Sequence, residues 1–277
     1  MIAMNRLGII GFGAISQSLI EVLREQGQTY SSLALLVLPE KEQETRVKAE
    51  ALCGKAVQNL VVTGDLETFL ETRPELVVEC AGHSAVLKYL KPICDAGTNV
   101  VLASIGALSD PDLYDLVWDA ARNSPAQVQL PAGAIGGIDV LAAARLSGIT
   151  SVVYTGRKPA NAWAGTPAEK KLNLNELTEP TVFFEGSARE AAQEYPKNAN
   201  VAATLALAGI GMDDTQVRLI ADPTTTKNTH EYSVVSGATE YSMRMTGKAS
   251  ALNPKTSMTT VYSLARAVLN QSAAIVI

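Results

Sequence analysis

The sequence has few aromatic residues and no excess of positive charge. Phenylalanine, tryptophan and tyrosine make up 5% of its 277 residues, so a folded core must be built from alanine, valine, leucine and isoleucine. That composition is typical of strands that are buried on both faces beneath helices. Lysine and arginine number 23 against 28 acidic residues, which gives a net charge of −5. Nucleic-acid-binding domains are usually basic, so we expect no nucleic-acid partner.

Long apolar runs and paired cysteine motifs are also missing. The longest uncharged stretch, Asn123–Ile138, contains two prolines and two glutamines, and it is too short and too polar to span a membrane. The apolar run near the N-terminus leads into Gly-x-Gly rather than a cleavage site, so we expect no signal peptide. Cys53, Cys80 and Cys94 are odd in number and lack zinc-site spacing. They indicate buried thiols, no metal site and a cytoplasmic location.

Strand and helix patterns alternate through the first half of the chain. A helix is expected after Asp110, a favoured N-cap residue, with Pro111 in its first turn. Strands alternating with helices predict a parallel sheet with right-handed crossovers. We therefore expect a Rossmann-type doubly wound α/β domain over residues 1–134. The expected strands are Arg6–Ile10, Leu33–Leu38, Leu60–Thr63, Leu76–Cys80, Asn99–Ala103 and Gln127–Leu130.

The pattern changes in the second half, where several apolar runs alternate with polar residues. Such alternation is typical of an antiparallel sheet with one covered face, and Gly237 is suited to a hairpin between the last two runs. Residues 135–251 therefore predict a second α+β domain with a mainly antiparallel sheet, in which Pro159–Glu179 forms a surface loop. A C-terminal helix within 252–277 would complete the first domain. The expected strands are Ser151–Thr155, Thr181–Phe184, Gln216–Ile220, Glu231–Val235 and Glu240–Met245.

A glycine-rich turn follows the first expected strand. Gly11 and Gly13 belong to a G-x-G-x-x-S motif between a strand and a helix, where dinucleotide-binding folds carry their fingerprint. Gly11 permits the tight turn, and Gly13 lets the backbone approach a pyrophosphate. The N–H groups of Ala14 and Ile15 at the helix start can bind its charge. Ser16 stands where glycine or alanine is usual. The context predicts dinucleotide binding, although a structural glycine turn would give the same motif.

Two later strand ends bear on the same cofactor. An acid after the second strand favours NAD, because it binds the ribose hydroxyl, whereas a cation favours NADP. Here Glu40 is followed by Lys41, so both cofactors stay open, as does an ordinary charged loop. Ala81 and Gly82 follow the fourth strand and would allow the cofactor to approach closely. For His83, at the start of the next helix, we expect a surface or capping role.

One segment of the second half is more specific than the rest. Glu194–Thr204 reads EYPKNANVAAT, and with it the chain resembles the L-aspartate dehydrogenase family. The resemblance spans nearly the whole chain, and the Y-P-x-N-x-N-V-A-A element is its most specific part. The other similar segments are Gly11–Ile15, Gln129–Gly137, Thr155–Pro159, and His230 with Ser236–Ala238.

The resemblance implies NAD(P)-dependent oxidation of L-aspartate to iminoaspartate. The imine then gives oxaloacetate and ammonia in water, or it feeds NAD biosynthesis. The resemblance also implies a homodimer that uses NAD or NADP, with the second domain for substrate binding and dimerisation. The family's NAD-contacting alanine and asparagine correspond to Ala134 and Asn200, and its active-site histidine corresponds to His230.

The residue types agree with that chemistry. Oxidation of an amine requires loss of a proton, and a histidine that titrates near neutrality suits this task. The substrate's carboxylates need donors, for which Arg157, Lys197 and Asn198 are candidates. Each of these three also has an ordinary alternative, as a solvated charge or a helix cap.

Two alternative functions remain at this point. A dihydrodipicolinate reductase or homoserine dehydrogenase type of enzyme shares the same domain layout, so fold alone does not exclude it. A non-catalytic NAD(P)-binding sensor would keep Gly11 and Gly13 but would need no positioned His230.

Overall fold

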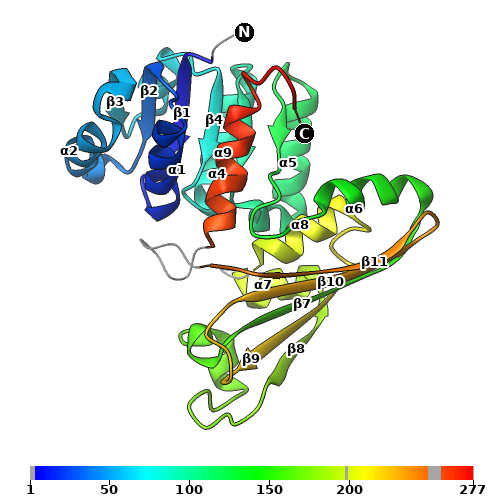
Figure 1. The fold of residues 1–277 in the computed structure, drawn as a ribbon. Helices are drawn as coiled ribbons and strands as arrows, with labels where there is room; N and C mark the ends of the chain where they lie inside the picture. The colour runs from blue at the N-terminus through cyan, green and yellow to red at the C-terminus, as the bar shows by residue number, and fades with distance from the viewer. Residues whose placement is uncertain (1–3, 197–198, 249–256, 277) are drawn as a thin grey trace. The chain divides into compact units, whose positions relative to one another are not determined.

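The computed structural model describes residues 4–196, 199–248 and 257–276. It divides into two compact units, drawn in Figure 1: the first comprises 1–131 and 260–277, and the second comprises 132–259. In the described part of the chain, every helix is too short or too polar to cross a membrane.

The first unit is built on a six-stranded parallel sheet in the order β3-β2-β1-β4-β5-β6. This is the strand order of doubly wound dinucleotide-binding folds, in which ligands bind where the order reverses, beside the carboxyl ends of β1 and β4. The strands are β1 (Arg6–Ile10), β2 (Tyr30–Leu36), β3 (Val57–Thr63), β4 (Leu76–Glu79), β5 (Asn99–Leu102) and β6 (Val128–Gln129). The helices are α1 (Ala14–Glu25), α2 (Glu42–Cys53), α3 (Leu66–Glu71), α4 (His83–Asp95) and α5 (Pro111–Arg122).

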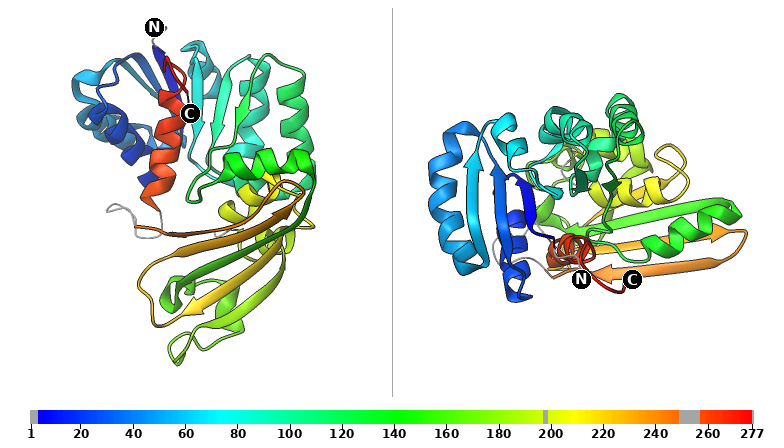
Figure 2. Two further views of the ribbon diagram at one scale, coloured as in Figure 1. Left: turned by 45° about the vertical axis from the view of Figure 1, so that its right-hand side comes forward. Right: turned by 90° about the horizontal axis from the view of Figure 1, so that it is seen from above.

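Helices cover both faces of this sheet. The last helix, α9 (Met258–Leu269), lies on the same face as α1, whereas α4 and α5 lie on the opposite face (Figures 1 and 2). The α9 side chains of Val261, Leu264 and Val268 are fully buried. The predicted C-terminal helix thus begins at residue 258, and residues 252–256 of the predicted range lie outside the described residues.

Local sequence signals explain several of these elements. The central strands are buried aliphatic runs, such as Val77 and Val78 in β4. α5 begins at the predicted cap, because the Asp110 carboxylate accepts the N–H groups of Asp112 and Leu113 at 3.0 and 3.1 Å. The Rossmann-type part of the predicted fold class is therefore confirmed.

The second unit contains a five-stranded sheet in the order β11-β10-β7-β9-β8. Its neighbouring strands are antiparallel except for β7 and β9, which confirms the mainly antiparallel α+β prediction. The strands are β7 (Ile149–Pro159), β8 (Thr181–Ser187), β9 (Gln216–Asp222), β10 (Thr229–Ser236) and β11 (Glu240–Thr246). The helices are α6 (Ile138–Ala144), α7 (Ala188–Glu194) and α8 (Asn200–Ala208).

The segment Pro159–Glu179, predicted as a surface loop, is exposed or half-buried over most of its length, but it is anchored to the sheet by a buried tryptophan. It contains two short 3-10 helices, η5 (Ala160–Trp163) and η6 (Pro167–Lys170). The Trp163 indole is fully buried, donates its N–H to the Ile220 carbonyl at 3.1 Å, and packs edge-on against the Phe183 ring. One buried residue such as Trp163 produces no periodic pattern in the sequence. The polar residues around it therefore led to the prediction of a surface loop.

Candidate functional site

The turn between β1 and α1 has the backbone that a pyrophosphate requires. Gly11 has φ of +86°, and a Cβ added there would lie 2.9 Å from the Ala81 Cβ, so only glycine fits. A Cβ at Gly13 would meet no atom within 4 Å, which leaves an open space beside the first N–H groups of α1. Ser16 is fully buried and its hydroxyl donates to the Gly13 carbonyl at 3.0 Å. Serine in the third motif position is therefore satisfied locally.

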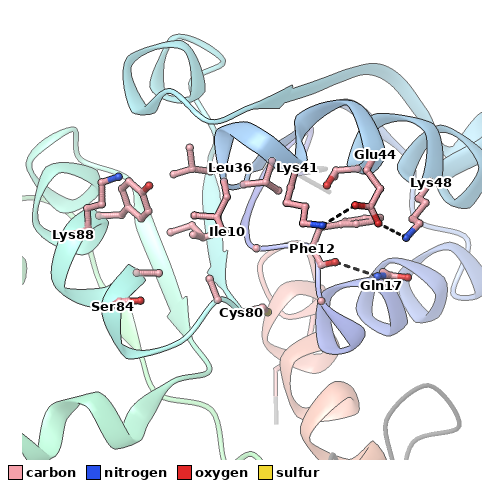
Figure 3. Close-up of a pocket in the computed structure, with 18 residues that line it drawn as sticks. Ile10, Phe12, Gln17, Leu36, Lys41, Glu44, Lys48, Cys80, Ser84 and Lys88 are labelled. Carbon is pink, nitrogen blue, oxygen red and sulfur yellow. Dashed lines mark hydrogen bonds and ion pairs between the residues drawn. The ribbon is translucent and has the colours of Figure 1, made fainter.

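A pocket of about 520 Å³ opens beside this turn, between the carboxyl end of β2, α2 and the start of α4 (Figure 3). Its volume is in the range of small-molecule sites. The pocket is lined by Gly11, Gly13 and Ala81 of the predicted cofactor site, whereas Ala14 and Ile15 follow directly along α1 without lining it. Three lysines and one glutamate supply its charged groups, so the lining is positively charged overall: Lys41, Lys48, Lys88 and Glu44. These features fit an anionic dinucleotide.

Glu40 does not lie where a contact with the cofactor's ribose was expected, at the end of the second strand. This residue lies exposed on the short helix η1 (Pro39–Lys41) and does not line the pocket, whereas its neighbour Lys41 does. Lys41 and Lys48 flank Glu44, with Nζ atoms 2.9 and 2.7 Å from its carboxylate. Their hydrogen bonds lower the pKa of Glu44 to about 2. Two cations held by one anion therefore stand where the ribose of an adenosine group is expected.

A buried carboxylate that sequence reasoning missed organises the carboxyl edge of this sheet. Glu79, the last residue of β4, is fully buried. Its carboxylate accepts the N–H groups of Ala81 and Gly82 at 2.6 and 2.8 Å. It also accepts the N–H and hydroxyl of Ser104 at 3.0 and 3.1 Å. Glu79 thus joins the loops that follow β4 and β5. The sequence did contain a signal for Glu79, because an acidic residue directly follows the apolar run of β4. Buried charged groups are rare unless they have a structural or functional role.

In the second unit, His230 lies near the start of β10 and is 8% exposed. Its Nδ1 atom lies 2.8 Å from the hydroxyl of Tyr154 on β7. Burial, together with the positive charge of Lys158, lowers the pKa of His230 to about 4. The imidazole is therefore neutral at physiological pH, in contrast to an isolated histidine, which titrates near neutrality.

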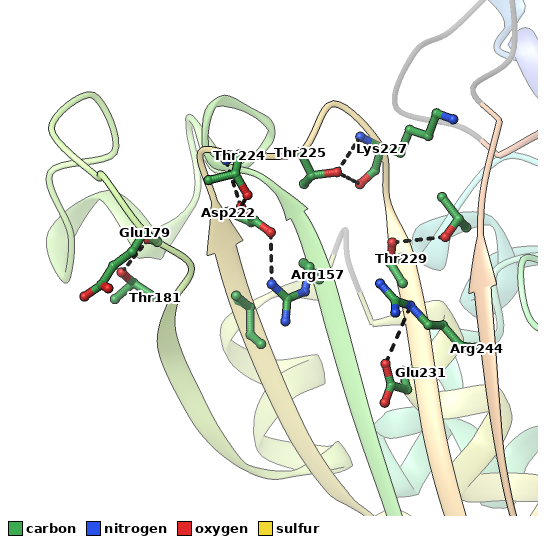
Figure 4. Close-up of polar contacts among 12 residues, drawn as sticks. Arg157, Glu179, Thr181, Asp222, Thr224, Thr225, Lys227, Thr229, Glu231 and Arg244 are labelled. Atoms are coloured by element: carbon green, nitrogen blue, oxygen red, sulfur yellow. Dashed lines mark hydrogen bonds and ion pairs between the residues drawn. The ribbon is translucent and has the colours of Figure 1, made fainter.

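Arg157 and Lys158 point to opposite faces of β7, because side chains alternate along a strand. Lys158 shares the face of Tyr154, and its Nζ lies 4.8 Å from the Trp163 ring centroid. Arg157 lies on the other face and pairs with Asp222 at 2.9 Å (Figure 4). The structure therefore does not bring Arg157 together with His230.

Asp222 is a well-satisfied partner for that arginine. Burial raises the pKa of Asp222, but hydrogen bonds from Thr224 and Arg157 outweigh this effect, so the pKa lies below its ordinary value. The Thr224 N–H and hydroxyl both donate to the same carboxylate, as Figure 4 shows. The ion pair therefore has a sufficient structural role at this end of β7 and β9.

The other predicted site residues fall in different places. Ala134 is half-buried between β6 and α6, and Asn200 is exposed at the first residue of α8. Both belong to the second unit, whereas the pocket belongs to the first. Lys197 and Asn198 lie outside the described residues. Within the described ranges, no group of histidine, cysteine, aspartate and glutamate side chains is arranged to hold a metal ion.

Comparisons with known proteins match both units. Residues 139–271 match the family model "Aspartate dehydrogenase, C-terminal", and residues 11–131 match "Homoserine dehydrogenase, NAD binding domain". The chain is 46% identical to the L-aspartate dehydrogenase of Polaromonas sp. strain JS666, over 99% of this chain and 100% of that one. It is 44% identical to the L-aspartate dehydrogenase of Pseudomonas aeruginosa, over 98% and 99%.

Solved structures show the same relationship. The crystal structure of aspartate dehydrogenase from Thermotoga maritima matches with a TM-score of 0.73 and 27% identity, over 99% of both chains. A hyperthermophilic archaeal homoserine dehydrogenase matches with a TM-score of 0.58 over 96% of this chain and 98% of that one. Because the identity is only 13%, this match shows a common fold and nothing further.

Replacing Glu79 tests its role at the sheet edge. Glu79→Gln keeps the shape of the side chain, but it replaces one carboxylate oxygen with an NH₂ group. In the wild-type protein backbone N–H groups donate to both carboxylate oxygens, and an NH₂ group cannot accept them. We expect the free energy of unfolding to fall by about 1–3 kcal/mol, and the Kd for NADH to rise because the Ala81–Gly82 loop loses its anchor. Urea denaturation and fluorescence titration measure the two effects. Glu71→Gln, which removes an exposed carboxylate from α3, is the control. Unchanged stability and NADH affinity in Glu79→Gln would contradict this role.

Proposed function

The chain belongs to the aspartate dehydrogenase family, and on this premise we propose that it catalyses the NAD(P)-dependent oxidative deamination of L-aspartate. The similarity to L-aspartate dehydrogenases over almost the whole of both chains carries the proposal. The positively charged pocket beside the Gly11–Gly13 turn supports it independently, because that chemistry needs a dinucleotide. A homodimer and a cytoplasmic location are further parts of the proposal, and they rest on the family resemblance and on three cysteines without disulfides.

The reaction removes a hydride from Cα of L-aspartate and a proton from its amino group, and the C=N bond of iminoaspartate forms. A bound nicotinamide supplies the hydride acceptor. Water then adds to the imine carbon, and ammonia leaves to give oxaloacetate. The chain must therefore bind the dinucleotide, orient a dicarboxylate and provide polar groups at the reacting centre.

We assign the dinucleotide to the first unit's pocket. The N–H groups of Ala14 and Ile15 at the start of α1 would bind the charge of its pyrophosphate, and Gly13 would leave room for its approach. Ala134 and Asn200 stay proposed NAD contacts on the family motif. For Glu40, which does not line the pocket, we propose no contact, and we assign the ribose end to Lys41 and Lys48 instead.

We assign the substrate's carboxylates to donors near His230. The positive charge of Lys158 contributes to lowering the pKa of His230, and Lys158 lies on the same face of β7 as Tyr154. Arg157 lies on the opposite face of β7 from Tyr154 and His230, which favours Lys158 over Arg157 for this role. Lys197 and Asn198 remain candidates because they stand inside the family motif.

The activity itself is the first test. Purified protein mixed with L-aspartate should reduce NAD⁺ or NADP⁺, and oxaloacetate with ammonia should oxidise NADH or NADPH, as followed by the absorbance of the reduced nicotinamide. Homoserine and other amino acids serve as comparison substrates. Absence of turnover with L-aspartate in both directions and with both cofactors would refute the proposal.

His230→Asn tests the proposed active-site residue. We expect kcat/KM for L-aspartate to fall by about 10- to 100-fold, because the variant loses a polar group proposed to contact the substrate. The Kd for NADH should change little, because His230 does not line the pocket assigned to the dinucleotide. The matched control is His83→Asn, since His83 is the other histidine and is half-buried at the start of α4. If His230→Asn keeps a normal kcat/KM for L-aspartate, the residue has no role at the active site.

Lys41→Ala tests the choice between NAD and NADP. A charge-assisted hydrogen bond to the 2′-phosphate predicts that the Kd for NADPH rises by about ten- to a hundredfold. The Kd for NADH should change little, because NADH lacks that phosphate. Lys88→Ala, on the α4 side of the pocket, should change both constants by a similar factor (Figure 3). An equal loss for both cofactors in Lys41→Ala would show that Lys41 does not read the 2′-phosphate.

A further inference from the structure

Tyr154 and His230 form a buried pair across two adjacent antiparallel strands. In the β7–β10 register, Tyr154 stands opposite Tyr232 and His230 stands opposite Gly156. The pair is therefore diagonal, and the two rings lie nearly parallel, with an interplanar angle of 16° and centroids 6.1 Å apart. The Tyr154 hydroxyl oxygen lies 2.8 Å from Nδ1 of His230.

Gly156 makes this diagonal contact possible. A Cβ built on Gly156 would lie 2.8 Å from the Tyr154 hydroxyl oxygen and 3.2 Å from a methyl carbon of Leu219. Its φ does not lie in the left-handed region, so the backbone does not demand glycine here. The missing side chain instead provides the space through which Tyr154 reaches His230.

The direction of the hydrogen bond follows from the surroundings of the phenol. Tyr154 is 2% exposed, and within the described residues its hydroxyl has no other hydrogen-bond partner. If Nδ1 donated to the phenol, the phenolic hydrogen would be buried without an acceptor, which costs about 1–3 kcal/mol. Burial raises the pKa of Tyr154, so the phenol keeps this hydrogen. Donation from Tyr154 to Nδ1 satisfies both atoms.

We propose that Tyr154 is a positioning residue that fixes His230 as its neutral Nε2–H tautomer, so that His230 meets a substrate carboxylate as a hydrogen-bond donor and not as a general base. The tautomer follows from the geometry, whereas the role toward substrate rests on the proposed function. Burial and Lys158 disfavour the imidazolium, which agrees with a neutral ring.

This assignment changes the chemistry expected of His230. The Nδ1 lone pair accepts the phenolic hydrogen and Nε2 carries a hydrogen, so neither nitrogen has a lone pair for the substrate's amine proton. That proton therefore leaves to an acceptor other than His230. In the described part of the chain, Nε2 has no hydrogen-bond partner, and it is not among the fully buried polar atoms that lack one. Its N–H, together with the Lys158 ammonium, suits one carboxylate of a dicarboxylic acid.

Nitrogen NMR on the whole protein tests the tautomer directly. The chain has only two histidines, so protein labelled with ¹⁵N-histidine gives signals from two rings, and His83→Gln assigns them. At neutral pH we expect a pyridine-like Nδ1 and a pyrrole-like Nε2 for His230. A pyrrole-like Nδ1, or a doubly protonated ring, would overturn the proposal. This measurement needs no substrate and no turnover.

Two tyrosine variants separate positioning from a purely structural role. Tyr154→Phe removes the donor but keeps the ring, and we expect His230 to become a mixture of tautomers and the KM for L-aspartate to rise. Tyr232→Phe is the matched control, because its buried hydroxyl donates to the Gly136 carbonyl at 2.9 Å and not to His230. It should leave the His230 signals unchanged. A single Nε2–H tautomer that persists in folded Tyr154→Phe would remove Tyr154 from this role, and the wild-type spectrum decides the tautomer even if that variant does not fold.

A substitution at His230 tests the donor role itself. Glutamine reaches further than asparagine and ends in an amide N–H, so His230→Gln should retain more activity with L-aspartate than His230→Asn. Equal loss in both variants would contradict the donor role. The tautomer assignment and the proposed function can fail separately. If the protein shows the Nε2–H tautomer but does not turn over L-aspartate, the proposed function is contradicted and the tautomer assignment still holds.

Discussion

The buried carboxylate of Glu79 is the interaction on which the cofactor edge of the first sheet depends. It gathers backbone N–H groups from the loops after β4 and β5 and fixes where Ala81 lies. Ala81 in turn stands against Gly11, which has no room for a side chain. Glu79 at the end of β4 therefore influences the shape of the phosphate-binding turn indirectly, through the position of Ala81. Because the carboxylate is fully hydrogen-bonded, its burial is tolerated.

The local features of the fold could be predicted from the sequence because neighbouring residues encode them. Aliphatic runs marked the strands, Asp110 marked a helix start, and Gly237 marked a hairpin that the structure places between β10 and β11. Features that depend on one distant partner could not be predicted. Trp163 is buried through a contact with Ile220, and nothing in the residues beside Trp163 indicates that contact.

The candidate site shows the same division. The glycine turn was visible because its spacing is local, whereas the Tyr154–His230 contact joins residues 76 positions apart through a strand register. Burial then set the protonation state of His230 in a way that its residue type did not indicate. At the end of β2, adjacent charges suggested Glu40, but the one-turn spacing of Lys41, Glu44 and Lys48 decides which groups reach the pocket.

The placement of α9 has a consequence for synthesis on the ribosome. All six strands of the first sheet emerge before the second unit, whereas α9, which belongs with that sheet, emerges after it. Translation is vectorial, so the second unit can complete its own sheet while the first still lacks Val261, Leu264 and Val268. During that interval the nascent first unit exposes the apolar surface that α9 later covers. The dinucleotide-binding unit, although its synthesis starts first, is therefore the last to be completed.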